Sequence, residues 1–253
     1  MIIGRDPVRL AAAIAVVQSR TSVTAPGYLC DFSSQADIRR LASELLRDLQ
    51  RIDVLVNNAG GISRRRRVTP DGLEQTFATN HLGYFLLTDL LLERIVASAP
   101  ARIVTVASMG HRRGAIDFGN LGFERGGYSL MRAYSRSKLA NVLFANELAR
   151  RLAGKQVTSN SVHPGNVSTK IWADAPLWAQ PLIYLLLRRS FITPEEGART
   201  VVQLAVSPDL NGVTGKYFEN QQPVTPAPLA QDEALARRLW DVSEQLIGVV
   251  SRP

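Results

Sequence analysis

The sequence predicts an α/β protein built on a doubly wound parallel sheet with helices on both faces. Residues 53–57 and 102–107 are nearly continuous apolar runs, typical of strands buried on both faces of a parallel sheet. Segments with helical periodicity alternate with such runs along the chain, which indicates β-α-β units. A length of 253 residues suits one domain, 1–253, with a full hydrophobic core.

The N-terminal part of the chain predicts two short strands and two helices. Residues 1–4 and 28–31 are expected to be strands, and the Ala-rich residues 8–18 a helix. Ser34 is expected to cap the next helix, with Asp37 completing a capping box. These elements precede the buried strand that ends at Asn57.

The rest of the chain continues the alternation of strands and helices. Thr69-Pro70 predicts the start of a long helix that continues to about Ser98, because proline is favoured in a first helical turn. The other expected elements are a helix over 128–151, a strand at 156–162, a helix with a capping box beginning at 193–196, a strand at 216–219 and a helix at 230–247.

Composition and charge argue against several functional classes. The net charge of +8 comes from arginines scattered in doublets rather than from one basic stripe, so no nucleic-acid interface is predicted. Cys30 is the only cysteine, which argues against a disulfide framework or a Cys-based metal site and fits a reducing, cytoplasmic location. No run reaches the roughly 18 apolar residues that a membrane-spanning helix needs.

The sequence Tyr134-Ser135-Arg136-Ser137-Lys138 lies within the helix expected over 128–151. Residues four apart share one helix face, so the phenol of Tyr134 and the ammonium of Lys138 are expected to be neighbours. A nearby ammonium favours the phenolate and lowers the phenol pKa toward the range that is useful for proton transfer. Such pairs also arise by chance on exposed helices, so the interpretation depends on further motifs.

Further motifs occur along the chain in a consistent order. They are Asn57-Asn58-Ala59-Gly60, Asn80, Ser108 and Pro164-Gly165-Asn166-Val167-Ser168-Thr169. Together with Tyr134 and Lys138, these motifs resemble the short-chain dehydrogenase/reductase family, whose fold is of the Rossmann type, and the resemblance runs from Met1 to about Pro223. Residues 79–87 (TNHLGYFLL) and 215–218 (GKYF) are similar to the retinol-dehydrogenase-like branch.

The resemblance implies catalytic roles for four residues. Tyr134 would exchange a proton with the substrate oxygen, and Lys138 would lower the Tyr134 pKa and bind the nicotinamide ribose. Ser108 would hold the substrate oxygen against Tyr134, because a hydroxyl can both donate and accept. Asn80 would belong to a proton relay behind Lys138. This mechanism requires no metal.

The resemblance also implies a nicotinamide cofactor. Arg5 favours NADP over NAD, because an arginine after the second strand of such folds accommodates the 2′-phosphate. Asp31 matches the position that contacts the adenine amino group, although a carboxylate there also reads as a loop cap. The remaining cofactor-binding positions implied are Asn57, Ala59, Gly60, Tyr134, Lys138, Pro164, Gly165, Val167 and Thr169.

The glycine-rich phosphate turn of this family, Thr-Gly-x-x-x-Gly-x-Gly, does not occur in the sequence. Gly4-Arg5-Asp6 instead matches the end of the family's second strand, so the first βα unit is expected to be missing or incomplete. We therefore expect a truncated or mis-started version of a longer enzyme. The alternative is a natural variant whose sheet closes up by pairing other strands.

The predicted function is NADP-dependent interconversion of an alcohol and a carbonyl on a hydrophobic substrate. One alternative is a catalytically silent fragment that cannot bind nucleotide, which the missing phosphate turn favours. Another is a sugar-nucleotide epimerase or dehydratase, because extended relatives share the Tyr-x-x-x-Lys pattern. The short C-terminal part and the match at 57–60 argue against the epimerase.

Two segments leave their interpretation open. Residues 170–193 occupy the position of the family's substrate lid and are strongly apolar, with Trp172 and Trp178 among them. They read either as a cover for a hydrophobic substrate or as a surface buried against a partner subunit in a homodimer. The run Arg64–Arg67 reads either as a solvated loop or as a weak contact with an anionic membrane surface.

Overall fold

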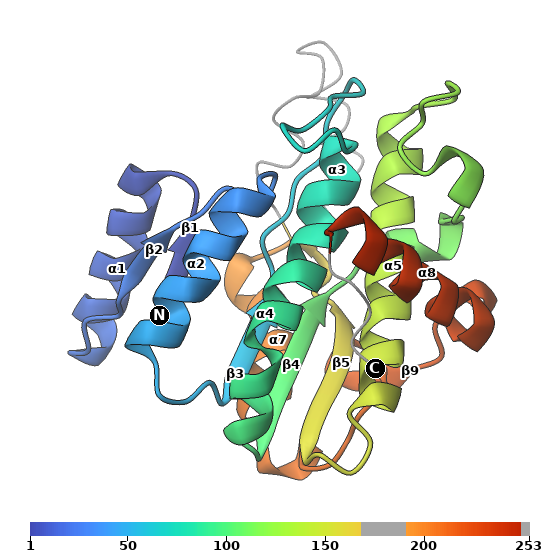
Figure 1. Cartoon of the computed structure of the whole chain (residues 1–253). Helices are drawn as coiled ribbons and strands as arrows, with labels where there is room; N and C mark the ends of the chain where they lie inside the picture. Colours follow the sequence, from blue (N-terminus) through green and yellow to red (C-terminus); the bar gives the residue numbers. More distant parts are fainter. Residues whose placement is uncertain (168–190, 249–253) are drawn as a thin grey trace.

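The computed structural model describes residues 1–167 and 191–248. The predicted α/β architecture with a parallel sheet and flanking helices is confirmed (Figure 1). Adjacent strands of the main sheet are parallel except for the last pair, which forms an antiparallel hairpin. The strand order is β3 (Val54–Asn57), β4 (Ala101–Val106), β5 (Val157–His163), β8 (Tyr217–Glu219) and β9 (Gln222–Val224).

The N-terminal strands form a separate two-stranded sheet. β1 (Ile2–Gly4) pairs in parallel with β2 (Gly27–Leu29) and not with β3, so the sheet does not close up by joining these strands. Among the described residues β3 has a strand partner on one side only. The expectation that β3 is fully buried is therefore wrong at Val56, which is 39% exposed.

Helices cover both faces of the main sheet, as predicted. In Figure 1 most of them lie in front of the strands, while α7 (Pro194–Val206) lies behind. Leu204 of α7 packs with Val104, Val162 and Phe218 in a small core on that rear face. The front layer consists of α2 (Gln35–Asp48), α4 (Gly83–Ala97), α5 (Leu130–Arg151) and α8 (Glu233–Leu246), and α1 (Pro7–Thr21) packs on β1 and β2.

Local capping explains where two of the helices begin. The capping box of α7 is confirmed, with the Thr193 side chain and the Glu196 side chain each bonded to the other residue's backbone. At α2 only half of the predicted box forms: the Ser34 hydroxyl accepts from the Asp37 amide. The Asp37 carboxylate accepts instead from the amide of Asp31, and so ties the end of β2 to this helix.

The predicted helix start at Thr69-Pro70 is wrong. The chain turns there, with Gly72 at a φ of +78°, a left-handed conformation that suits glycine. The helix begins later, at α3 (Gln75–Phe77), because the Glu74 carboxylate accepts from the amides of Thr76 and Phe77. It continues through a π-helical turn, η1 (Ala78–Leu82), into α4.

The sequence also did not predict several short elements. These are β9, the two-stranded pair β6 (Asn166–Val167) and β7 (Phe191–Ile192), and the 3-10 turns η2 (Met109–Arg113), η3 (Phe118–Asn120), η5 (Pro208–Leu210) and η6 (Pro228–Gln231).

Candidate active site

Several residues predicted for the site, Asn57 and Ser108 among them, lie where strands of the main sheet end. Asn57 ends β3, Ser108 follows the end of β4, and His163 ends β5. Because these strands are parallel, their carboxyl ends meet at the same edge, which is where open α/β folds bind ligands. Tyr134 and Lys138 come from α5, whose start is set by Ser129, which accepts from the amide of Arg132.

Tyr134 lies against Ser108. Burial of the phenol raises the pKa of Tyr134, and a hydrogen bond with the Ser108 hydroxyl acts in the opposite direction. The predicted net lowering of the Tyr134 pKa is not what the structure gives, because burial of the phenol outweighs the opposing hydrogen bond. The structure therefore brings Ser108 and Tyr134 together as predicted, but the pKa of Tyr134 is raised rather than lowered.

Gly110 makes this close approach feasible. A Cβ atom at Gly110 would lie 3.2 Å from Cε1 of Tyr134 and 3.5 Å from Oγ of Ser108. The Gly110 amide also donates to the Ser108 hydroxyl oxygen over 3.1 Å. A side chain at this position would therefore lie tightly against the phenol ring of Tyr134 and in ordinary contact with the Ser108 hydroxyl. The sequence reasoning did not single out this glycine, although its position two residues after the serine was visible.

Lys138 is buried behind Tyr134. Its Nζ donates to the carbonyl oxygen of Val106 over 2.9 Å and lies 5.8 Å from the centre of the Tyr134 ring. Burial lowers the pKa of Lys138 to about 8. Asn141, three residues further along α5, donates to the same carbonyl over 3.1 Å. The sequence shows only that Asn141 shares a helix face with Lys138, because the two residues are three apart.

Asn80 lies in the π-helical turn η1 and organises the turn after β3. Its side-chain oxygen accepts from the amide of Gly61, and its Nδ2 donates to the carbonyl of Gly61 and to the hydroxyl of Ser137 on α5. A Cβ at Gly60 would lie 3.2 Å from the Asn80 oxygen, so the predicted need for a small residue there is visible. Asn80 therefore links this turn to α5 rather than contacting Lys138 directly through its side chain.

Two further residues of this turn, Asn57 and Ala59, form hydrogen bonds with buried side chains of α4. The Asn57 side chain is buried and donates to the hydroxyl of Thr88, so it stabilises the packing of α4 on the sheet. The carbonyl of Ala59 accepts from the hydroxyl of Tyr84, a buried residue that the sequence reasoning missed. Burial strongly raises the pKa of Tyr84, which keeps it a donor.

Arg5 and Asp31 lie at the carboxyl ends of β1 and β2. Arg5 is exposed. The neighbouring Asp6 caps α1, with its Oδ1 accepting from the amides of Val8 and Arg9. Asp31 accepts from both the amide and the hydroxyl of Ser33, which is the loop-cap geometry that the sequence left open.

The segment after β5 is described only in part. Pro164 and Gly165 follow His163, and Gly165 has a φ of +92°, with a Cβ position 2.4 Å from Cδ1 of Ile192. Val167 pairs with Ile192 through the backbone. Thr169 and residues 168–190, which include most of the predicted lid, lie outside the described residues.

Ser108, Tyr134 and Lys138 fit the nicotinamide and ribose end of a dinucleotide. Two hydroxyls and an amine, from Ser108, Tyr134 and Lys138, gather at the ligand edge of the sheet. A Cβ at Gly60 would lie tightly against the Asn80 side-chain oxygen, and a glycine in this turn leaves its backbone open to close approach. For the pyrophosphate, the sequence contains no glycine-rich turn of the expected form.

The comparisons with known proteins identify the family. The short chain dehydrogenase model matches residues 1–180. The chain belongs to the short-chain dehydrogenase family. It is 47% identical over 222 residues to retinol dehydrogenase 14 of Mus musculus and 41% identical over 227 residues to retinol dehydrogenase 13 of Homo sapiens. The resemblance to the retinol-dehydrogenase-like branch is thereby confirmed.

Each of these matches covers 87% of the chain and 66% or 67% of the relative, so the chain spans about two thirds of the length of these curated proteins. Among solved structures, a protein of unknown function from Mycobacterium paratuberculosis matches with a TM-score of 0.74 and 32% identity, over 99% of this chain and 84% of that chain. A blue fluorescent protein from a metagenomic library, solved in complex with NADPH, matches with a TM-score of 0.65 and 23% identity, over 85% and 83%. This last likeness concerns the fold alone.

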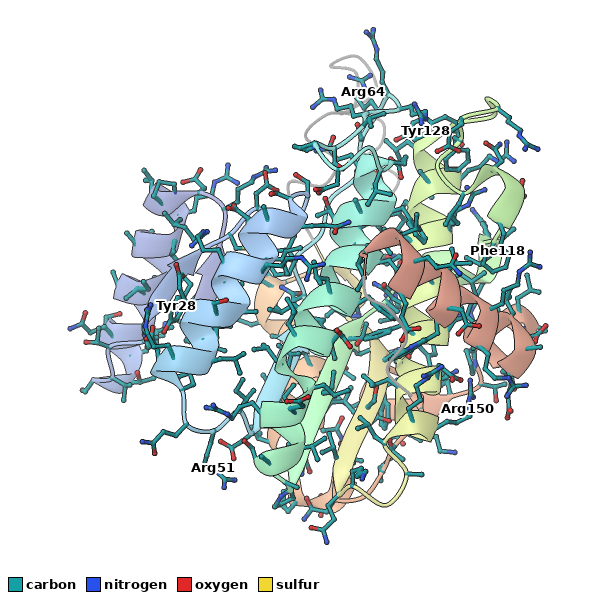
Figure 2. The ribbon with its side chains drawn as sticks, in the orientation of Figure 1. Tyr28, Arg51, Arg64, Phe118, Tyr128 and Arg150 are labelled. Atoms are coloured by element: carbon teal, nitrogen blue, oxygen red, sulfur yellow. The ribbon has the colours of Figure 1, made fainter. Side chains whose placement is uncertain are left out.

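The arginine run 64–67 lies near the loop before α5. Figure 2 shows Arg64 projecting outward at the end of the molecule where Tyr128 lies, and the Tyr128 hydroxyl donates to the carbonyl of Ser63. Arg66 donates to the carbonyl of Gly122, and all four arginines of the run are exposed. Within residues 1–167 and 191–248, no helix is long and apolar enough to cross a membrane.

Proposed function

We propose that this short-chain dehydrogenase is an NADP-dependent oxidoreductase that interconverts an alcohol and a carbonyl on a hydrophobic substrate. The observation that carries the proposal is the contact between the Ser108 hydroxyl and the Tyr134 phenol beside the buried amine of Lys138. Hydroxyl groups in this arrangement can hold a carbonyl oxygen and exchange a proton with it.

The roles of the individual residues follow from their positions. Ser108 donates a hydrogen bond to the substrate oxygen and holds it against Tyr134. Tyr134 gives its proton to that oxygen during reduction and takes it back during oxidation. Lys138 stabilises the phenolate that this transfer leaves behind, because an ammonium favours a nearby negative charge. Asn80 contributes to the proton relay behind Lys138. When bound, the nicotinamide supplies or accepts the hydride.

Arg5 supports the preference for NADP. It is an exposed cation at the carboxyl end of β1, and Asp6 beside it is committed to capping α1. An acidic residue in place of Arg5 would hold the 2′-hydroxyl of NAD, whereas the guanidinium of Arg5 suits the 2′-phosphate of NADP. The solved relative in complex with NADPH is consistent with this choice.

Titration of the purified chain with NADPH and NADH, followed by fluorescence, tests the cofactor. We expect tighter binding of NADPH, and Arg5→Glu should remove that preference. Arg9→Glu is the matched control, because Arg9 is a nearby exposed arginine on α1. A preference that survives in Arg5→Glu would contradict the assignment. Binding of neither cofactor would support the alternative of a catalytically silent protein.

The substrate proposal rests on the apolar composition of residues 170–193 and on relatives that are named retinol dehydrogenases. We expect kcat/KM for carbonyl reduction with NADPH to be higher for a long-chain aldehyde than for a short water-soluble aldehyde. Equal values for the two would contradict a hydrophobic substrate. The measurement is the loss of NADPH absorbance at matched aldehyde concentrations.

Two partner proposals accompany this function. The exposed Arg64, Arg65 and Arg67 suit a weak contact with an anionic lipid surface, which co-sedimentation with anionic and neutral vesicles would test. The apolar stretch 170–193 suits a homodimer interface, which light scattering of the purified chain would test. Equal sedimentation with both vesicle types, or a monomeric mass, would contradict the respective proposal.

A further inference from the structure

His111 has both ring nitrogens engaged. Nδ1 lies 2.7 Å from the carbonyl oxygen of Ser108, and Nε2 lies 3.0 Å from the backbone nitrogen of Ala227. A backbone N–H can only donate, so Nε2 must present its lone pair. The proton of the neutral ring is then on Nδ1, which donates to the Ser108 carbonyl. The two contacts together define one tautomer.

These contacts fix the backbone of the candidate catalytic serine. The Ser108 carbonyl accepts from the His111 ring and also from the His111 backbone amide over 3.0 Å. On the other side of the residue, the Ser108 hydroxyl oxygen accepts from Gly110. The serine is therefore held at its carbonyl and at its side chain, and the direction of its hydroxyl toward Tyr134 depends on both.

The far side of the imidazole joins a distant part of the chain. Ala227 connects β9 to η6, and its amide is buried with Nε2 as the acceptor. The His111 ring also packs against Tyr217 of β8, with ring centres 4.7 Å apart at an interplanar angle of 63°. His111 thus ties the turn after β4 to the segment that leads into α8.

We propose that His111 is a positioning residue for Ser108, and that its Nδ1–H tautomer couples the serine to the connection between β9 and η6. The catalytic consequence rests on the proposed function, because it assumes that Ser108 holds the substrate oxygen. The coupling itself depends only on the geometry of the ring.

The surroundings keep the ring neutral. Burial lowers the pKa of His111, the bond to the Ser108 carbonyl and the charge of Glu219 act in the opposite direction, and Arg112 adds to the lowering. The other titratable groups close to it are Tyr217 on β8 and His163 on β5. A proton on Nε2 would face the Ala227 N–H, so a charged ring could not keep both contacts.

Three substitutions distinguish the effect of the hydrogen bond to Ser108 from that of the hydrogen bond to Ala227. In His111→Asn the side-chain amide takes the place of Nδ1 and can still donate to Ser108. In His111→Gln the side-chain amide takes the place of Nε2 and can still accept from Ala227. In His111→Phe both bonds are lost, while a ring remains against Tyr217. The assay is carbonyl reduction with NADPH by the whole chain, with kcat and the cofactor Kd measured separately.

We expect His111→Phe and His111→Gln to lower kcat by about tenfold or more, because each loses the bond that orients Ser108. The Kd for NADPH should stay within about twofold of the original, since a lost orienting bond affects the transition state and not cofactor binding. His111→Asn should restore most of the kcat that His111→Phe loses. Unchanged kcat in His111→Phe, or rescue by Gln and not by Asn, would overturn the proposal.

Two further measurements are independent of activity. Nitrogen NMR of the His111 ring should show Nδ1 protonated and Nε2 unprotonated at neutral pH. Hydrogen exchange at the Ala227 amide should be slow, and should quicken in His111→Asn and His111→Phe. An Nε2–H tautomer would overturn the coupling even if the enzyme is active. If no carbonyl is reduced, the proposed function fails while these two results still decide the coupling.

Discussion

The main sheet and the separate N-terminal sheet differ in how firmly they hold their helices. In α5, which carries Tyr134 and Lys138, most residues from Ala133 to Ala149 are buried, whereas Leu10 is the only buried residue of α1. Helix α5 packs on β4, β5 and α8, while α1 covers the two strands β1 and β2 alone. The helix that positions the chemistry is therefore enclosed, and the helix next to the expected cofactor-phosphate end is not.

Helix α5 also buries charged side chains, whereas the charged side chains of α1 are exposed to water. Lys138, Arg136 and Glu147 are all buried, and each has hydrogen-bond or ion-pair partners. On α1, Arg9 and Arg20 are exposed. Burying a charge is costly unless it is paired, so such groups are found where surrounding structure supplies the partners. The contrast locates the preorganised part of the protein in the β4–α5–β5 region.

The largest expected effect comes from Tyr134→Phe. Loss of a positioned proton donor should lower kcat for carbonyl reduction by about 10²–10⁴-fold. Tyr28→Phe is the control in the exposed half, because the Tyr28 hydroxyl donates to Asp48 at the surface and should change kcat little. Initial rates with NADPH, checked against circular-dichroism melting curves, measure both. Similar rates for the two variants would remove the catalytic role of Tyr134.

Core substitutions should reveal the difference in packing. Leu143→Ala in α5 should lower the free energy of unfolding by about 2–5 kcal/mol, because the fully buried side chain leaves a cavity. Val16→Ala in α1, where the side chain is 50% exposed, should change it by less than about 0.5 kcal/mol. Urea denaturation followed by circular dichroism gives both values. Equal losses would show that α1 is as firmly packed as α5.

A closer comparison is available within one pair of strands. Val56 and Val104 face each other in the register of β3 and β4, but their exposed fractions are 39% and 1%. Val104→Ala should cost about 2 kcal/mol of unfolding free energy, and Val56→Ala less than about 1 kcal/mol. The same denaturation measurement applies. A larger loss at Val56 would mean that this edge of β3 is covered in solution.

The smallest effect is a pH dependence that only the enclosed half can produce. Because burial lowers the pKa of Lys138 to about 8, its ammonium loses its proton as pH rises through that value. We expect kcat for carbonyl reduction to decline above about pH 8, up to about tenfold per pH unit. Between about 8 and the ordinary value of 10.5 the unfolded chain binds the extra proton, so folding stability should rise with pH.

The rate profile, measured in a constant-ionic-strength buffer series, checks this prediction. Lys138→Met should abolish the pH-dependent decline as well as lower the rate. A decline that remains in Lys138→Met would assign the titration to another group.

Much of the candidate site was predictable because it depends on local spacing and on strand ends. Tyr134 and Lys138 share a face because residues four apart do so on any helix. The end of the apolar run 102–107 predicted that Ser108 lies at the carboxyl end of a strand. The π-helical turn at Asn80 and the delayed helix start after Gly72 were not predictable, because the proline signal at Pro70 competed with a turn that the sequence pattern did not reveal.

By itself the sequence determined the α/β class, the family and the residues that gather at the carboxyl edge of the sheet. Only the tertiary structure decided what those residues touch. It bonded Lys138 to Val106, raised the Tyr134 pKa through burial, and joined His111 to Ala227 across the fold. The physical reason is range: periodicity and capping act within a few residues, whereas burial and the partners of a polar side chain depend on distant segments.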